Sequence, residues 1–241
     1  MIVPNANVKP EYTYNIDLSI SQKMADKVTI DFTVFYSLFT NAIIKAPFTL
    51  NGQDSILYDG VKSQVLANQN VNKANLAGFS IGLQAKCIKG LTWYSTLNYT
   101  YGSFKTDGTK KSSIYEKQTN GSYALVERNV SSKPLDHIPP LMGKISLAYE
   151  YKKFSTELHI LYNGWKRLEN FNADGEDNAQ YATADGMPSW ATLNWKANIS
   201  FTKNVQLQLA IENIFDKNYR YFASGFSAAG RNYLVGLRAN W

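Results

Sequence analysis

The sequence predicts an all-β fold, an antiparallel transmembrane β-barrel segment of about nine strands. Three observations indicate it. Polar and apolar residues alternate in nine segments, the segments run about 10 to 14 residues, and short and long connections take turns between them. Soluble sheets use strands of about 5 or 6 residues, whereas a tilted strand needs about 10 to cross a hydrocarbon core. The length and the alternation therefore both favour a membrane strand.

Each segment places apolar side chains at every second position. In the first segment Tyr12, Ile16 and Ile20 alternate with Asn15 and Ser19, so one face of the strand is apolar and the other polar. The predicted strands lie, in order, at residues 12–20, 28–38, 79–87, 92–101, 144–151, 154–163, 192–201, 205–212 and 232–241.

The connections between these segments alternate in length without exception. Short links fall at residues 22–26, 89–90, 152–153 and 202–204, and long links at 41–74, 104–139, 167–189 and 217–230. An outer-membrane barrel has tight periplasmic turns on one rim and long extracellular loops on the other. The C-terminus follows a long link and is therefore predicted on the periplasmic side, and the long links are predicted to be solvated loops.

Aromatic residues gather near the predicted strand ends, as two interfacial bands would require. The predicted extracellular band contains Tyr36, Tyr99, Tyr101, Tyr162 and Trp190. The predicted periplasmic band contains Trp93, Tyr149, Tyr151, Phe154, Phe201 and Trp241.

Composition argues against several other functions. The net charge of +6 is scattered along the chain rather than gathered into a basic stripe, so no nucleic acid is expected as a partner. His159 faces the predicted lumen, but neither an orienting group nor an oxyanion hole accompanies it, so no enzyme activity is expected. With two histidines and the single Cys87, the sequence predicts no metal site, no cofactor and no catalytic residues.

Two stretches near the C-terminus resemble a known family. The run Ile211-Glu-Asn-Ile-Phe-Asp-Lys-Asn-Tyr219, then Gly230-Arg-Asn-Tyr233, resembles the end of TonB-dependent outer-membrane receptors. The segment Asn5-Ala-Asn-Val-Lys-Pro-Glu11 is similar to a weaker motif of that family, with Ala6 and Val8 where Pro and Leu are usual. The resemblance implies a cell outer membrane location and a 22-stranded barrel closed by a plug.

On that resemblance, residues 1–241 form one incomplete domain, the last nine strands of the 22-stranded barrel. The implied partners are outer-membrane lipid, the thirteen N-terminal strands and the plug of the same receptor, and the barrel-assembly machinery; TonB would be reached only through the plug. The assembly signal would be the alternating residues of the last strand, Tyr233, Val235, Leu237, Ala239 and Trp241.

The resemblance implies uptake of a scarce nutrient such as a ferric siderophore, haem or cobalamin. Aromatic residues in the long links, with one histidine, are the candidate ligand contacts. They are Tyr115, Tyr123, His137, Phe171, Tyr181, Tyr221 and Phe222. Two alternatives remain open at this stage, a passive porin-like or structural outer-membrane barrel and a truncated, non-functional remnant.

Overall fold

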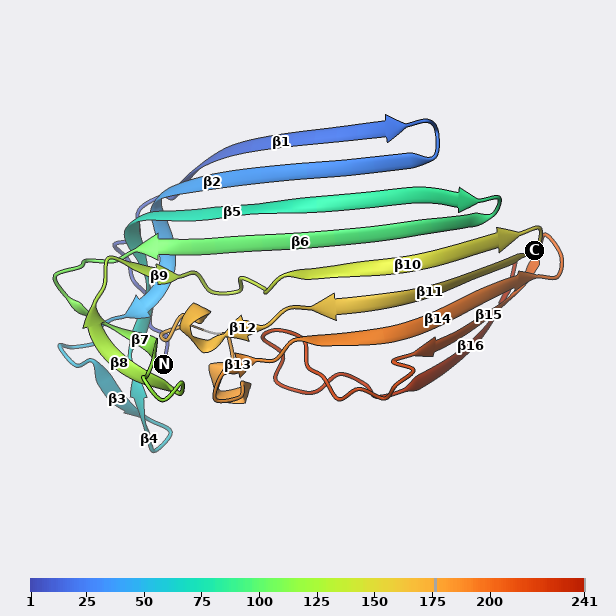
Figure 1. The fold of residues 1–241 in the computed structure, drawn as a ribbon. Coiled ribbons are helices and arrows are strands. Elements are labelled where there is room, and N and C mark those ends of the chain that lie inside the picture. Colours follow the sequence, from blue (N-terminus) through green and yellow to red (C-terminus); the bar gives the residue numbers. More distant parts are fainter. Residues whose placement is uncertain (176, 241) are drawn as a thin grey trace.

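The computed structural model describes residues 1–175 and 177–240, which form one large antiparallel sheet (Figure 1). Nine long strands neighbour one another in chain order, with β1 and β16 at the two edges of the sheet. They are β1 (Tyr12–Met24), β2 (Val28–Pro47), β5 (Leu66–Ile88), β6 (Leu91–Lys105), β10 (Met142–Tyr151), β11 (Phe154–Asn163), β14 (Trp190–Ser200), β15 (Val205–Glu212) and β16 (Asn232–Ala239). Each of the nine alternating segments coincides with one of these strands, and the all-β antiparallel prediction is confirmed.

Shorter elements lie in the long connections. The strands β3 (Ser55–Tyr58) and β4 (Val61–Gln64) form a hairpin, as do β7 (Lys111–Lys117) and β8 (Tyr123–Asn129). The strand β9 (Ser132–Pro134) pairs with β6, and β12 (Lys166–Arg167) pairs with β13 (Gly186–Met187). Two 3-10 turns complete the set, η1 (Leu168–Asn170) and η2 (Ala179–Tyr181). No helix in the described part of the chain has the length and apolarity needed to cross a membrane.

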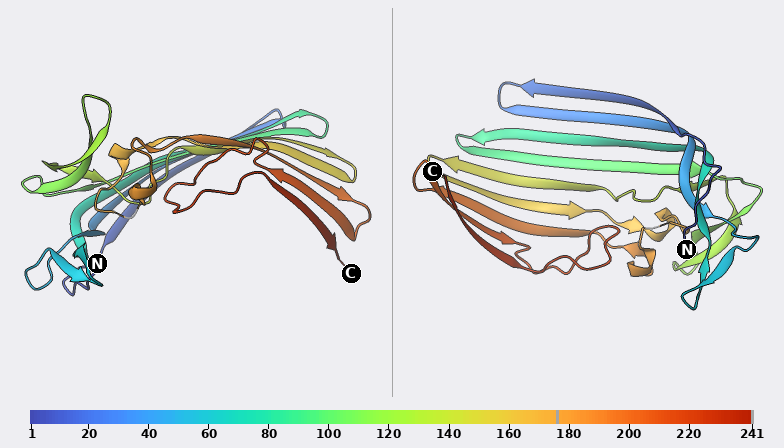
Figure 2. Two further views of the ribbon diagram at one scale, coloured as in Figure 1. Left: turned by 90° about the horizontal axis from the view of Figure 1, so that it is seen from below. Right: turned by 180° about the vertical axis from the view of Figure 1, so that it is seen from behind.

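The sheet is arched, and its two ends differ (Figures 1 and 2). The short links and the end of β16 lie at one end, here called the turn end, and the hairpins and 3-10 turns lie at the other, here called the loop end. The loop between β15 and β16 hangs on the hollow side of the arch (Figure 2). In the sequence, the turn end corresponds to the predicted periplasmic rim.

Strand register brings the apolar positions of neighbouring strands onto one face. Ile16 pairs with Tyr36 and Leu18 with Val34 in the first hairpin. The same alignment continues to the other edge of the sheet, through Phe79–Tyr99, Leu158–Trp195, Leu207–Leu237 and Leu209–Val235. A slip of one residue would turn every side chain of a strand to the opposite face. The register therefore produces one apolar face, predicted to meet lipid, and one polar face.

The predicted loop at residues 41–74 is partly wrong. β2 runs on to Pro47 and β5 begins at Leu66, so their ladder extends well beyond the predicted ends of the alternation. Asn41 has a positive φ of 52°. On the far side of it, Ala42 and Ile44 pack with Val71, Ala74 and Phe104 on the polar face of the sheet. Such a loss of alternation is expected where a strand leaves a membrane, because there neither face has to remain apolar.

The C-terminal motif of the sequence closes the loop between β15 and β16. Asn213 is buried, with a positive φ of 49°, and its side-chain amide exchanges hydrogen bonds of 2.8 and 2.9 Å with the backbone of Lys217. The carboxylate of Asp216 accepts the backbone N–H of Arg231 at 2.7 Å. At Gly230 a Cβ atom would lie 2.5 Å from that carboxylate, so any larger residue would have to displace it. These contacts, here called the Asn213 clamp, hold the two ends of the loop together.

The residues of the predicted assembly signal lie on β16 at the edge of the sheet. Tyr233, Val235 and Leu237 are highly exposed on the apolar face, and Ala239 pairs with Val205. Trp241 lies outside the described residues. The proposed role of these residues in barrel assembly stays a prediction.

Two glycines on the polar face of β5 provide a test of the sheet's packing. A Cβ atom at Gly78 would lie 2.4 Å from the carbonyl oxygen of Tyr99 and 2.6 Å from the ring of Phe35. At Gly82 its nearest neighbours would be atoms of Asp31, at 3.5 Å or more. We expect Gly78→Ala to destabilise the sheet by about 1–3 kcal/mol through overpacking, and Gly82→Ala to be neutral. The measurement is the temperature to which samples of the intact protein must be heated before the folded band is lost on a gel; equal temperatures for the two variants would contradict this packing.

Candidate functional site

Three long connections meet in a small apolar core at the loop end, here called the loop core. Leu168, Phe171 and Met187 are buried at its centre. The β7–β8 hairpin adds Tyr115 and Tyr123, and the β15–β16 loop adds Phe222. Four of the seven predicted contact residues thus come together. Phe171 is only 2% exposed and holds the loops to one another, the structural role that an aromatic loop residue can have without any ligand.

A buried ion pair lies beside this core. The ammonium of Lys166 is 3.9 Å from the carboxylate of Asp177, with side chains that are 6% and 1% exposed. The same ammonium donates to the carbonyl of Ile138 at 2.5 Å and lies over the rings of Phe222 and Phe171, at 4.7 and 5.5 Å from their centroids. Burial lowers the pKa of Lys166 and raises that of Asp177, although each charge partly offsets the shift of the other.

His137 lies against this pair rather than in a ligand cluster. Its backbone N–H donates to the carboxylate of Asp177 at 2.6 Å, and its backbone has a positive φ of 58°. Its imidazole is 64% exposed, with Nδ1 3.4 Å from the same carboxylate. No group of three or more His, Cys, Asp and Glu side chains within the described ranges is arranged to hold a metal ion.

A second aromatic group forms a pocket under the β15–β16 loop. Trp190 is 7% exposed, and its ring centroid lies 4.3 Å from that of Tyr219 and 5.2 Å from that of Tyr221. Trp190 pairs with Asn163 on the polar face of the sheet, so it is not part of the lipid-facing band in which the sequence analysis placed it. Since the loop lies on the hollow side of the arch, these contacts show that the polar face is the concave one (Figure 2).

This space, here called the aromatic pocket, has a volume of about 280 Å³. Its wall contains the rings of Tyr181, Trp190 and Tyr219 and the cations Lys217 and Arg220, and no carboxylate among the described residues. Arg220 donates to the carbonyl of Tyr181 at 2.9 Å and lies over the ring of that residue. Burial and a hydrogen bond with Tyr221 raise the pKa of Tyr219, so its phenol stays protonated. The pocket thus combines aromatic surface with positive charge.

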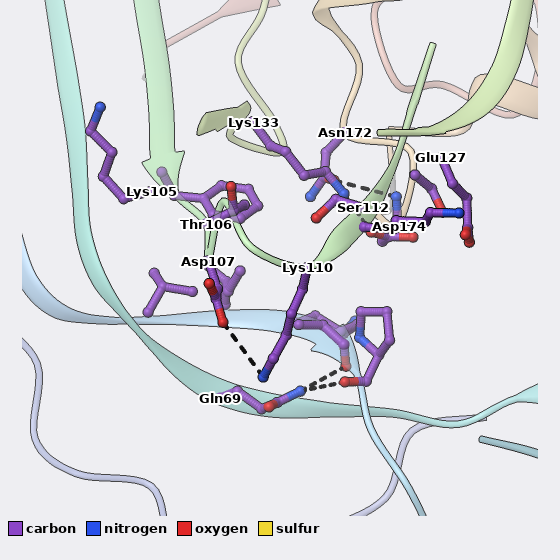
Figure 3. Close-up of a pocket in the computed structure, with 18 of the residues that line it drawn as sticks. Gln69, Lys105, Thr106, Asp107, Lys110, Ser112, Glu127, Lys133, Asn172 and Asp174 are labelled. Atoms are coloured by element: carbon purple, nitrogen blue, oxygen red, sulfur yellow. Dashed lines mark hydrogen bonds and ion pairs between the residues drawn. The ribbon is translucent and has the colours of Figure 1, made fainter. Parts of the chain in front are cut away.

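A larger cavity of about 760 Å³ opens between the ends of β2, β5 and β6 and the β7–β8 hairpin (Figure 3). Its floor includes Ile44, Val71 and Phe104 on the concave face. Its charges are largely matched, because Lys133 forms a buried ion pair with Asp174, and Lys110 lies 3.6 Å from Asp107. This cavity can accept a polar ligand but has little net charge to attract one.

Below the loops, charges on the concave face form a network around Glu157. Its carboxylate lies 2.5 Å from the ammonium of Lys144 and 2.8 Å from that of Lys196. His159 Nδ1 lies 3.6 Å from the same carboxylate. These residues balance one another across three strands, as in a wet or filled barrel interior. His159 is a member of that network.

The predicted contact residues differ in their exposure and in their neighbours. Tyr181 and Tyr221 are about half exposed beside the aromatic pocket, whereas Tyr115, Tyr123, Phe171 and Phe222 belong to the loop core. The sequence analysis missed Tyr219, Lys217 and Arg220, and it assigned Trp190 to the wrong face. One signal was available for Trp190, because it shares its parity with Thr192 and Asn194 in the same strand, both of which face inward.

A concave polar face, an apolar convex face and loops gathered at one rim define the wall of an outer-membrane β-barrel. The family model described as TonB-dependent receptor-like, β-barrel, matches residues 1–214. The chain belongs to the TonB-dependent receptor family, whose members are transporters of the outer membrane and not enzymes.

Two curated relatives are similar over nearly the whole chain. A protein of Haemophilus influenzae described as probable hemoglobin and hemoglobin-haptoglobin-binding protein 4 is 25% identical, over 94% of this chain and 21% of its own length. The iron-regulated outer membrane virulence protein of Vibrio cholerae is 20% identical, over 98% of this chain and 32% of its own length. The chain thus spans between a fifth and a third of these relatives.

Solved structures share the fold at low identity. The copper transporter OprC superposes with a TM-score of 0.68 at 17% identity, covering 97% of this chain and 32% of its own. The FrpB iron transporter of Neisseria meningitidis superposes with a TM-score of 0.64 at 14% identity, and the match covers 99% of this chain and 33% of the transporter. The ferric enterobactin receptor PfeA of Pseudomonas aeruginosa superposes with a TM-score of 0.61 at 18% identity, and the match covers 98% of this chain and 32% of the receptor.

The contribution of the Lys166–Asp177 ion pair to the stability of the loops can be tested by substitution. Lys166→Met would leave a buried carboxylate without its partner and should destabilise the loop core by about 3–5 kcal/mol. Arg167→Met, at the exposed neighbouring position, should have little effect. Hydrogen exchange of residues 168–187 in the intact protein measures the difference. If both variants exchange at the same rate, the buried pair does not hold the loops.

Proposed function

We propose that this chain forms the last nine strands of the barrel of a receptor that takes up a scarce, metal-containing nutrient. The aromatic pocket is the observation that carries the proposal. Rings from Tyr181, Trp190 and Tyr219 beside Lys217 and Arg220 suit an anionic ligand with flat, conjugated groups. A ferric siderophore or haem fits that description better than the third candidate, cobalamin.

The two edges of the sheet support the proposal that further strands complete the barrel. An unpaired backbone N–H or C=O in lipid costs several kcal/mol, so β1 and β16 both require neighbours. A 22-stranded barrel would supply them with thirteen further strands, and a plug would face the charged network around Glu157. In this proposal TonB acts through that plug, and the residues of this chain contribute ligand capture by the loops.

Several observations support capture at the loop end. The loop core and the Lys166–Asp177 pair hold three connections together, so the pocket is preorganised before a ligand arrives. Tyr181 and Tyr221 remain about half exposed and can gain contacts on binding. A passive porin-like barrel would not need this organisation. The iron- and haemoglobin-related relatives support the same class of nutrient.

Substitutions in the β15–β16 loop test ligand capture. We expect Tyr221→Ala and Arg220→Gln each to weaken ligand binding by about 1–2 kcal/mol, or about five- to thirtyfold, since interface tyrosines and arginines contribute most at such sites. Phe226→Ala is the matched control, because Phe226 lies in the same loop and is 80% exposed. The measurements are growth on single iron sources, either haem or defined ferric siderophores, and binding of whichever source supports growth.

Two results would overturn the proposal. If no iron source supports growth through the intact receptor, an energised iron-uptake function is excluded. If one source does, but Tyr221→Ala and Arg220→Gln behave like Phe226→Ala, the aromatic pocket is not the capture site.

A further inference from the structure

The cavity between the ends of β2, β5 and β6 and the β7–β8 hairpin, here called the hairpin cavity, is separate from the aromatic pocket. Among the described residues the two spaces share no lining residue. With about 760 Å³, the hairpin cavity has the size of a small-molecule site. Lys110 and Lys111 line it and are exposed, so it opens to solvent at the loop end. It can therefore be filled while the aromatic pocket is also occupied.

Charges of both signs line the hairpin cavity in nearly equal number. Among the described residues these are five lysines and four carboxylates. Lys133 and Asp174 form an ion pair with side chains that are 3% and 12% exposed, so both belong to the wall. A second pair joins Lys110 to Asp107 at 3.6 Å (Figure 3). An ion that entered this balanced set would lose hydration without a net attraction in return, so the cavity favours an uncharged occupant.

A buried amide brings an unpartnered donor to the wall of the cavity. Asn172 is only 5% exposed, and its side-chain oxygen accepts the backbone N–H of Asp174 at 3.3 Å. Its NH₂ group has no hydrogen-bond partner within residues 1–175 and 177–240. Buried amide donors are rarely left without an acceptor. The Asn172 side chain thus marks a place for an oxygen atom from outside the protein.

An acceptor and two hydroxyl groups lie on other walls of the cavity. The side-chain nitrogen of Gln69 donates to the carbonyls of Ala46 and Pro47 at 3.2 and 2.7 Å, so its side-chain oxygen remains as an acceptor (Figure 3). Ser112 and Ser113 of β7 are half-buried and add hydroxyls that can both donate and accept. A ligand must therefore offer donors and acceptors together, and on more than one side.

The floor of the cavity is apolar. Ile44 and Val71 are half-buried and Phe104 is 4% exposed, all on the concave face. An apolar floor below polar walls suits a ligand with C–H groups on its faces and hydroxyl groups at its edges, as in a pyranose ring. A peptide is less suitable, because peptides and proteins bind through large apolar anchors that need pockets of their own.

We propose that the hairpin cavity binds a short stretch of neutral oligosaccharide. Sugar oxygens accept from the NH₂ group of Asn172, and sugar hydroxyls exchange hydrogen bonds with Ser112 and Gln69. The C–H face of a ring lies on Ile44 and Val71. The site goes beyond nutrient capture in the aromatic pocket and does not depend on it. Its effect is to hold the loop end against a glycan, whether free or attached to a protein.

Binding of defined glycans to the intact outer-membrane protein tests the site. The protein, in a detergent without a sugar headgroup, is screened on an array of neutral and charged oligosaccharides, and every neutral glycan that is retained is then titrated. The array includes chitotetraose and its fully deacetylated form, which share a backbone and differ in charge. We expect at least one neutral glycan to bind, and charged counterparts to bind more weakly.

Substitutions in the wall should weaken this binding. We expect a two- to tenfold loss, roughly, for each hydrogen bond removed by Asn172→Leu, and separately by Ser112→Ala with Ser113→Ala. The serine variant lies on the hairpin and keeps the test valid if Asn172→Leu disturbs the loops. The matched control, Asn120→Leu with Ser122→Ala, changes the same residue types at the tip of the same hairpin, outside the cavity, and should bind as the wild type does.

Three results would overturn the proposal: no neutral glycan of the array binds, charged counterparts bind as tightly, or neither cavity variant binds more weakly than the control. A glycoprotein that carries the retained glycan, compared before and after enzymatic removal of that glycan, identifies the source. Loss of binding on removal supports an attached glycan, and binding of the released glycan supports a free one. Equal binding of the deglycosylated protein indicates a peptide ligand and also overturns the proposal. Growth on iron sources reports separately on the aromatic pocket.

Discussion

Backbone hydrogen bonding in lipid is the constraint on which this structure depends. A bilayer offers no partner to a free N–H or C=O, so each strand has to be paired along its full membrane-crossing length. The requirement makes the strands long, keeps neighbours antiparallel through tight turns and fixes the register. Once Ile16 pairs with Tyr36 and Leu18 with Val34, the lipid face of one strand determines that of the next, as far as Leu207 and Leu237 at the opposite edge.

Outside the membrane the same constraint relaxes, and sequence reasoning became weaker there. The nine membrane strands were predictable because only alternation satisfies lipid on one side and a polar interior on the other. Beyond Asn41 apolar residues of β2 and β5 pack on the concave face, so the pattern ends although the ladder continues to Pro47 and Leu66. The β3–β4 and β7–β8 hairpins were missed for the same reason, because their stability comes from local pairing and contacts between loops rather than from periodicity.

The sequence identified a class of candidate residues but not their contacts. The proposed ligand contacts are aromatic residues of the long links; of these, Tyr181 lines the aromatic pocket and Tyr221 packs against Trp190 beside it. The partners that give this pocket its chemistry, Trp190 and Arg220, come from a strand end and another loop. The buried pair of Lys166 and Asp177 is similarly invisible in the sequence, because only the meeting of separate connections removes both charges from water. Such pairings depend on tertiary structure, which a pattern along the chain does not encode.

The Asn213 clamp has a consequence for how such a protein can change. The side chains of Asn213 and Asp216 hold both ends of the β15–β16 loop together. The residues between the two ends of the loop therefore contribute little to the pairing of β15 with β16. The sequence of the loop can therefore vary without a change in the strands on either side. Mutations from Asn218 to Ala229 that spare the packed rings of Tyr219 and Phe222 can alter the surface of the loop while the wall beneath keeps its shape. Changes in that stretch therefore carry little penalty in the stability of the sheet.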